Sequence, residues 1–253
     1  MEKPLILVTN DDGITAKGIR SLVEVMQTFG EVIVVAPDKP QSGMGHAITI
    51  NNPLRIAKSN IFEGVEAYTT SGTPVDCVKL GIYELLKKKP DLIVSGINHG
   101  ANFSTNVLYS GTMSATVEGA MENIPSIGFS LCDFNADADF SGSQRIVKEV
   151  TELVFRNNFP NHICLNVNIP KLSKDAIKGI KICKQAAAYW NDKFEERKDP
   201  HGNSYYWLTG NFQEIKAEVN TDLHFIEEGY ATIVPTQFDM TAHAVMNDLI
   251  NWK

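Results

Sequence analysis

Short aliphatic runs alternate with amphipathic stretches over the first two thirds of the chain. Runs such as Leu5–Thr9 and residues 31–36, each bounded by turn-forming residues, are typical of buried strands. The pattern predicts further strands at 54–57, Glu66–Thr70, 92–95, 126–130, 163–167 and 229–235. It predicts helices at 17–29, 74–89, 110–122, 144–157 and 243–252. Such alternation predicts an α/β fold, with a parallel or mostly parallel sheet and helices on both faces.

The pattern changes beyond about Cys183, where aromatic and polar residues replace the aliphatic runs. Pairs and triplets of aromatic residues occur at 189–190 and 205–207, on either side of a turn-rich segment at 199–203. We expect a hairpin-like arm outside the core. Exposed aromatic residues on such an arm favour contact between subunits over catalysis.

The overall composition is that of a globular protein acting on small molecules. The chain has 253 residues, of which 43% are hydrophobic, enough for one large domain or a domain with an extension. Its net charge of -7 argues against binding a nucleic-acid polymer or a membrane surface, since both need a basic face. No leader or membrane-spanning run is recognised, so a cytoplasmic protein is expected. The four cysteines lack zinc-site spacing and are expected to be reduced thiols.

Two adjacent carboxylates follow the first predicted strand. Asp11 and Asp12 stand between Asn10 and Gly13, directly after the buried run. A turn with a helix N-cap would explain one aspartate. A neighbouring pair at a strand's carboxyl end instead predicts a cation, and carboxylate oxygens suit Mg²⁺, Mn²⁺ or Ca²⁺ better than zinc. The end of such a strand is also where open α/β sheets bind ligands.

Two further loops bring neutral polar groups to the same predicted edge. Ser42 lies in a turn-rich loop beside Gly43, where its hydroxyl could complete a hard-cation site or bind phosphate; a plain surface loop is the alternative. His46 in that loop is interpreted as structural. Asn98 follows another strand and offers a carbonyl to a metal and an amide to an oxyanion, and Asn102 adds a second neutral donor, with an Asx-turn as the alternative.

Similar small-residue sequences precede two of the predicted helices. At 71–74 we favour helix capping, with Pro74 in the first turn. At Ser110, Gly111 and Thr112 we favour phosphate binding, because a helix N-terminus presents free N–H groups and a positive dipole end. A predicted cation site at the edge of the sheet, beside a predicted phosphate-binding site, indicates phosphoester hydrolysis.

Five motif blocks in order resemble the SurE family, the stationary-phase survival proteins that act as metal-dependent 5'- and 3'-nucleotidases. They are ILVTNDDGITAKGI, VVAPDKPQSGMGHAIT, SGTPVDCVKLGI, DLIVSGINHGAN and YSGTMSATVEGA, which together span about residues 5–120. Thr221-Asp222, Gly229-Tyr230 and residues 232–235 also resemble the family's C-terminal pattern. The chain departs from the family at Asn106, which is neutral in a segment where members often carry acidic residues.

The resemblance implies a Rossmann-like α/β core forming a single domain over 1–253. About 184–253 would be a swapped C-terminal arm that builds homodimers or homotetramers. It implies one divalent cation, Mg²⁺ or Mn²⁺, held by Asp11, Asp12, Ser42 and Asn98. The residues expected to bind substrate or phosphate are Asn10, Gly43, Asn102, Ser110, Gly111 and Thr112.

The expected reaction is hydrolysis of nucleoside monophosphates, with Asp11, Asp12 and Asn98 as the catalytic residues. One aspartate would orient or deprotonate the attacking water, while Asn98 and the phosphate-binding groups would stabilise the spreading charge. An aspartyl-phosphate phosphatase is a second hypothesis, although such enzymes space their aspartates two residues apart. A non-catalytic metal-nucleotide sensor signalling through the arm is a third.

Overall fold

A computed structural model describes residues 3–215 and 218–252, so residues 216 and 217 of the predicted arm lie outside the described residues. The strands are β1 (Leu5–Thr9), β2 (Glu31–Pro37), β3 (Ile56–Ser59), β4 (Glu66–Thr70), β5 (Leu92–His99), β6 (Ser126–Leu131), β7 (Ile163–Ile169), β8 (Ile180–Ile182), β9 (Ala188–Lys198), β10 (Ser204–Glu214) and β11 (Ala231–Gln237). The α-helices are α1 (Lys17–Met26), α2 (Pro74–Leu80), α3 (Gly111–Met121), α4 (Ser141–Arg156), α5 (Asp222–Glu227) and α6 (His243–Ile250). A π-helical turn, η1 (Gly81–Leu85), and a 3₁₀ turn, η2 (Ser104–Leu108), complete the described elements.

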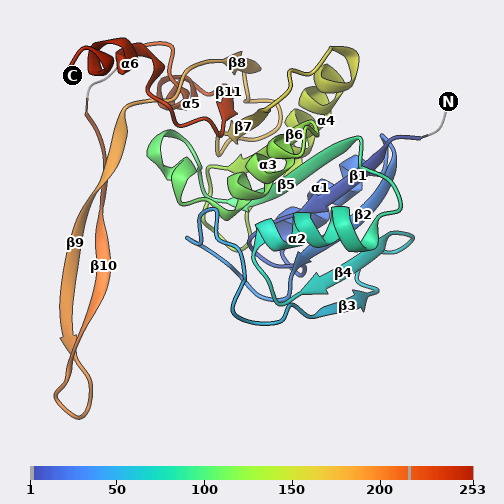
Figure 1. The fold of residues 1–253 in the computed structure, drawn as a ribbon, viewed down its shortest axis with the longest axis horizontal. Helices are drawn as coiled ribbons and strands as arrows, with labels where there is room; N and C mark the ends of the chain where they lie inside the picture. The colour runs from blue at the N-terminus through green and yellow to red at the C-terminus, as the bar shows by residue number, and fades with distance from the viewer. Residues whose placement is uncertain (1–2, 216–217, 253) are drawn as a thin grey trace.

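A mostly parallel central sheet forms the body of the molecule (Figure 1). Its strand order is β3-β4-β2-β1-β5-β6-β7-β11-β8, and the strands from β4 to β7 in that order are all parallel. The antiparallel pairings are β3 with β4 and β11 with β7. The expected α/β fold with a mostly parallel sheet is confirmed.

Helices cover both faces of the sheet because successive side chains of each strand point to opposite faces. Ile6 and Val8 of β1 join a core formed with α1 and α4, whereas Leu7 between them packs with α2 and α3 residues such as Val78 and Ala115. All of these side chains are fully buried.

The order in which successive strands are added to the sheet reverses between β1 and β5. From β1 the chain proceeds through β2 to β4 on one side, and then crosses over to β5, β6 and β7 on the other. Thr9 pairs with Ser95, so the carboxyl ends of the two strands lie side by side. A crevice outside the strand ends at such a switch point is where open α/β sheets bind ligands.

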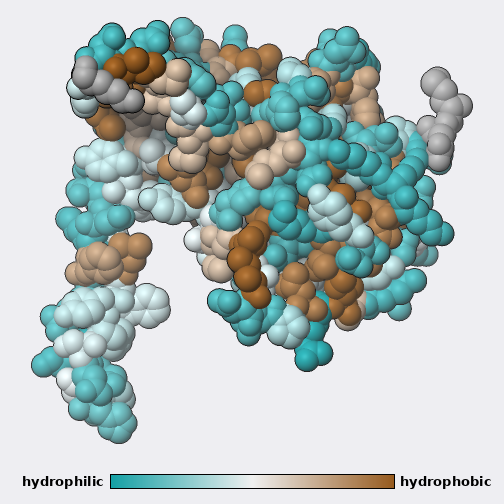
Figure 2. All heavy atoms as spheres, viewed as in Figure 1, coloured by the Kyte–Doolittle hydropathy of each residue, from teal (hydrophilic) through white to brown (hydrophobic). Residues whose placement is uncertain are grey.

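The predicted arm is confirmed as a long antiparallel hairpin of β9 and β10 that projects away from the body (Figure 1). Its tip is a turn in which Asp199 accepts hydrogen bonds from the backbone of His201 and Asn203. Aromatic side chains such as Phe194 and Trp207 are exposed along it. Figure 2 shows the arm as mainly hydrophilic and near-neutral residues with a more hydrophobic group among them, standing clear of a body whose surface mixes hydrophilic and hydrophobic residues.

The structure corrects several predicted boundaries. The helix expected at 74–89 ends at Leu80 and is followed by the π-helical turn η1. Gly81, which lies against Leu7, has low helix propensity. Further on, Pro90 disfavours helical structure in the lysine residue before it. The strand expected at 54–57 lies two residues later, where it pairs with β4. The elements β8 and α5 were not predicted, since each is too short for a periodic pattern. Across the described ranges, no helix is long and apolar enough to span a membrane.

Candidate active site

The aspartate pair lies at the switch point, immediately after β1. Asn10 supplies the local turn, because its side-chain amide donates to the carbonyl oxygen of Gly13 at 2.9 Å, and Gly13 takes the positive φ of 91° that this turn needs. The next helix, α1, is capped by Ala16 with no side-chain hydrogen bond. The two aspartates therefore lie in a turn, but neither of them caps a helix.

Asp11 is buried against the N-terminus of α3. The Thr112 hydroxyl donates to its Oδ1 at 2.5 Å, and a Cβ on Gly111 would lie only 2.7 Å from the Asp11 Cβ, so a glycine is needed there. Burial, and after it the negative charge of Asp12, raises the pKa of Asp11 to about 6. The free protein thus holds this carboxylate at an energetic cost that a bound cation would relieve.

Asp12, which follows β1, contacts the end of β5 beside Asn98. Asn98 was expected after the strand predicted at 92–95, but β5 continues through it to His99. The Asp12 Oδ2 accepts a hydrogen bond from the backbone N–H of His99 at 3.2 Å, and burial raises the pKa of Asp12. A register shift between Ser95 and Asn98 bends β5 relative to β6, as expected of a bulge that redirects side chains beside a site. The Asn98 amide nitrogen donates to the carbonyl oxygen of Gly100 at 2.8 Å, which fixes the side chain at this edge.

The loop that carries Ser42 and Gly43 is tied to the same edge. The N–H of Gln41 donates to the Asp11 carbonyl oxygen at 2.7 Å, and Gly45 donates to the carbonyl oxygen of Tyr109 at 3.2 Å. Ser42 and Gly43 are exposed, one and two residues beyond the contact with Asp11. The loop therefore bridges the aspartate pair and the segment that leads into α3.

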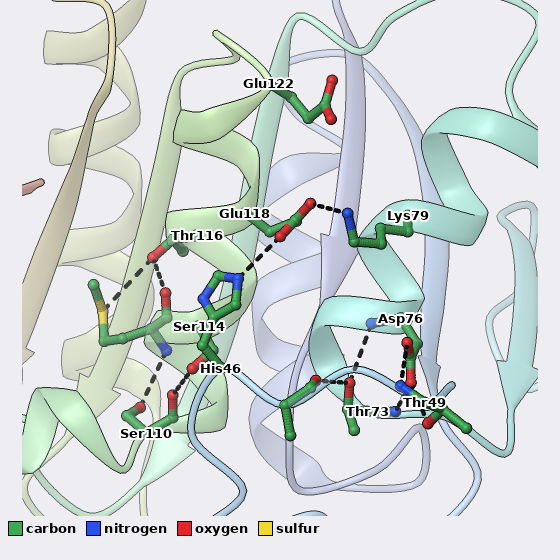
Figure 3. A network of polar contacts seen from close by, with 12 residues as sticks. His46, Thr49, Thr73, Asp76, Lys79, Ser110, Ser114, Thr116, Glu118 and Glu122 are labelled. Atoms are coloured by element: carbon green, nitrogen blue, oxygen red, sulfur yellow. Dashed lines mark hydrogen bonds and ion pairs between the residues drawn. The ribbon is translucent and has the colours of Figure 1, made fainter. Parts of the chain in front are cut away.

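Polar contacts from α2 and α3 hold the far end of this loop (Figure 3). His46 contacts the buried carboxylate of Glu118 at 3.0 Å, and Lys79 contacts its other oxygen at 2.5 Å, contacts that fit the structural role expected for His46. Burial would raise the pKa of Glu118, but hydrogen bonds from His46 and Lys79 outweigh it and leave that pKa below its ordinary value. Thr73 and Asp76 form a capping box on α2, so the capping role predicted for 71–74 is confirmed.

Two of the predicted phosphate-binding residues, Ser110 and Asn102, already make side-chain hydrogen bonds within the protein. Ser110 caps α3 by accepting from the N–H of Met113 at 3.1 Å. The buried Asn102 donates its side-chain amide to Ser130 at 2.8 Å, which leaves one amide hydrogen for a ligand. Asn106, the neutral departure from the family pattern, accepts a hydrogen bond from the indole of Trp190 at 2.8 Å and so joins the base of the arm.

Sequence reasoning missed three residues that hold the loop carrying Asn102. Asp222 accepts hydrogen bonds from the backbone of Ser104 and Ala186 at 2.9 and 2.8 Å. Asn166 and Asn168 of β7 bond the backbone of Asn102 at 2.7 and 2.8 Å. The available signal was the pair of asparagines at alternate positions of an otherwise apolar strand.

The donor set at this edge fits a hard divalent cation. Within the described parts of the chain, no group of three or more His, Cys, Asp or Glu side chains is arranged to hold a metal ion. A cation beside Asp11 and Asp12 would therefore need neutral oxygens, which Ser42 and Asn98 carry. The buried Asn10 Oδ1 has no hydrogen-bond partner in the described structure, a further sign of a polar site.

Comparison with known proteins gives one consistent result. The family profile described as "Survival protein SurE" matches residues 6–192. The 5'-nucleotidase SurE of Flavobacterium johnsoniae is 58% identical over 253 residues, covering 100% of this chain and 98% of that protein. The 5'-nucleotidase SurE of Christiangramia forsetii is 56% identical over 254 residues, again covering 100% of this chain and 98% of that protein. The crystal structure of SurE protein from Aquifex aeolicus has a TM-score of 0.83 and 36% identity, covering 98% of this chain and 99% of that one.

Proposed function

Because the chain belongs to the SurE family, we propose that it is a nucleotide phosphomonoesterase, hydrolysing nucleoside 5'- and 3'-monophosphates to nucleoside and phosphate. The observation that carries the proposal is the similarity over the whole chain to proteins named 5'-nucleotidase SurE. The aspartate pair at the switch point of the sheet supports it, since this is the place where the fold binds its ligands.

We further propose that Asp11, Asp12, Ser42 and Asn98 hold one divalent cation, Mg²⁺ or Mn²⁺. Support comes from the hard oxygen donors at one edge and from the burial and mutual repulsion that raise the pKa of Asp11. The cation supplies polarisation of a phosphoryl oxygen and a lowered pKa of bound water.

The remaining chemistry belongs to the chain's own groups. Asp11 is fixed by the Thr112 hydroxyl and Asp12 by the His99 N–H, and one of the two orients or deprotonates the attacking water. The Asn98 amide donates to a phosphoryl oxygen, which an ionised carboxylate in its place could not do. The other groups proposed to hold the phosphate are Asn10, Gly43, Asn102, Ser110, Gly111 and Thr112.

The arm formed by β9 and β10 is proposed to join subunits into a homodimer or homotetramer. Its exposed aromatic side chains, including Trp190, Phe194 and Trp207, support this role because aromatic residues are enriched at interfaces. The region around 184–253 would then act as a swapped extension of a single domain. A cytoplasmic location, with no nucleic-acid polymer or membrane as partner, stays a prediction.

Phosphate release from a panel of 5'- and 3'-nucleoside monophosphates tests the activity. The protein is stripped with a chelator and assayed before and after Mg²⁺ or Mn²⁺ is returned. We expect release that depends on the added cation. Tight nucleotide binding without release would favour the sensor hypothesis, and a phosphorylated protein trapped by rapid quench would favour the aspartyl-phosphate hypothesis.

A further inference from the structure

Two buried asparagines of β7 contact the loop that carries Asn102 but have been given no role in the reaction so far. Asn166 is 2% exposed and Asn168 is 0% exposed. Two residues apart on a strand, they lie on the same face of the sheet. Buried amides are costly unless each finds a hydrogen-bond partner, so their partners indicate what they do.

The two amides close a ring of hydrogen bonds with the backbone of Asn102. The Asn102 N–H donates to Oδ1 of Asn168 at 2.8 Å, and Nδ2 of Asn168 donates to Oδ1 of Asn166 at 3.0 Å. Nδ2 of Asn166 then donates to the Asn102 carbonyl oxygen at 2.7 Å. Together the two side chains satisfy both backbone groups of Asn102, as a neighbouring strand would. The ring needs a donor and an acceptor on each side chain, which leucine lacks entirely and ionised aspartate has only in part.

The side chain of Asn102 is fixed at the same place. Ser130 of β6 pairs in register with Asn168, and its hydroxyl accepts from the Asn102 amide at 2.8 Å. Side chains from two adjacent strands therefore hold the backbone N–H, the carbonyl and the amide of one loop residue. This network therefore restrains both the backbone and the side chain of Asn102.

Asn102 lies between the two parts of the proposed active site. The loop begins after β5, which carries Asn98, and ends at Ser110, which caps α3. The 3₁₀ turn η2 is the regular element described in this connection, and it begins two residues after Asn102. Connecting segments are more mobile than the elements they join, so a functional loop needs fixed points. The hydrogen-bonded ring supplies one in the middle of the connection.

We propose that Asn166 and Asn168 are positioning residues for phosphoester hydrolysis. They set the backbone of Asn102, and through it the phosphate-binding part of the loop between β5 and α3. This inference rests on the proposed function. The hydrogen bonds of the two side chains run to each other and to the Asn102 backbone, not to the proposed cation ligands Asp11, Asp12, Ser42 and Asn98. Their effect is therefore expected on phosphate binding, with cation binding unchanged.

Kinetic constants of Asn166→Leu and Asn168→Leu test the proposal. Thr232→Val is the matched control, because Thr232 pairs with Asn168 on β11, is equally buried, and has a hydroxyl with no partner in the described structure. We expect each leucine variant to raise KM for a nucleoside monophosphate and Ki for inorganic phosphate about 10- to 100-fold, as for displaced positioning groups. The Kd for Mn²⁺ should stay at the wild-type value, and the control should change none of the three.

A merely structural role gives a different pattern. It would lower the fraction of folded enzyme, so kcat would fall with the thermal midpoint while KM and Ki stayed constant; that result overturns the proposal. If a leucine variant does not fold, Asn166→Asp gives the same comparison, since it is nearly isosteric and loses the donor to the Asn102 carbonyl.

Amide hydrogen exchange of the segment around Asn102 separates this inference from the proposed function. The Asn102 N–H should lose protection in Asn168→Leu and keep it in Thr232→Val, whether or not the protein hydrolyses nucleotides. Unchanged protection in Asn168→Leu would overturn the ring as the anchor of the loop. Lost protection together with no hydrolysis by the wild type would leave the anchor standing and contradict the proposed function alone.

Discussion

Replacing Asp11 with asparagine should make the cation-free protein more stable while removing its activity. Burial and the charge of Asp12 raise the pKa of Asp11 from an ordinary 3.8 to about 6. Such a rise disfavours the ionised form in the folded state by about 3 kcal/mol, since each tenfold change in protonation corresponds to about 1.4 kcal/mol. Asparagine keeps the oxygen that accepts from Thr112 and removes the charge. The variant should therefore gain up to about 3 kcal/mol in free energy of unfolding at pH 8.

The pH dependence of this gain follows from the direction of the pKa shift. Below about pH 6 the folded wild type takes up a proton at Asp11 before the unfolded chain does, so its relative stability rises as the pH falls. The advantage of Asp11→Asn should shrink to roughly half at pH 5. Urea unfolding in the presence of a chelator at both pH values measures it. Added Mn²⁺ should stabilise the wild type and leave the variant unchanged, by mass action.

Asp38→Asn provides the control for this experiment. Asp38 follows β2 at the same sheet edge but is exposed, so its replacement should change the free energy of unfolding by less than about 0.5 kcal/mol. The reasoning would be refuted if Asp11→Asn were no more stable than the wild type at pH 8. A gain that is the same at pH 8 and pH 5 would refute it equally, because a gain from lost ionisation must depend on pH.

Three other predictions concern α3 and the arm. Gly111→Ala places a Cβ 2.7 Å from the Cβ of Asp11 and should lower kcat/KM about 100-fold with an unchanged far-ultraviolet spectrum; full activity would contradict the packing described. Replacing Phe194 and Trp207 of the exposed arm by serine should lower the assembly state in sedimentation velocity, and an unchanged state would contradict the arm's proposed role. Glu118→Gln should be less stable than the wild type at neutral pH, because hydrogen bonds hold the pKa of Glu118 below 4.5 and stabilise its ionised form. That difference should disappear as the pH falls through the lowered pKa, and urea unfolding from pH 7 to pH 3 would contradict it if the gap stayed constant.

The central strands such as Leu5–Thr9 could be predicted because they are short, nearly continuous aliphatic runs, and Glu66–Thr70 could be predicted from its alanine, tyrosine and threonines between turn residues. Leu5–Thr9 and Glu66–Thr70 were predicted with the observed bounds. The expected helix at 74–89 was wrong beyond Leu80. The spacing of apolar residues along the chain carries no information about the tertiary contact between Gly81 and Leu7. Short elements such as α5 depend on tertiary contacts and carry little local signal.

The site was predictable to the extent that parallel strands deliver their carboxyl ends to one edge. Asp12 and Asn98 were expected together on that ground, and the structure places Asp12 in contact with the backbone of His99, the residue after Asn98. The shared role of the two side chains stays a prediction. The engagement of Asn102 by β7 was not predictable, because it joins residues 64 and 66 positions apart in sequence. The cation and the phosphate-binding roles stay predictions.

Cation-dependent phosphate release by Asp12→Asn tests the central claim most directly. Wild type, Asp12→Asn and Asp38→Asn are stripped with a chelator and assayed on one nucleoside monophosphate as Mn²⁺ is titrated back. Asp12→Asn should lose about 100-fold or more in kcat/KM, while wild type and Asp38→Asn recover together. Full recovery of Asp12→Asn at wild-type Mn²⁺ concentrations would contradict the account of the aspartate pair as the centre of a cation-dependent nucleotidase.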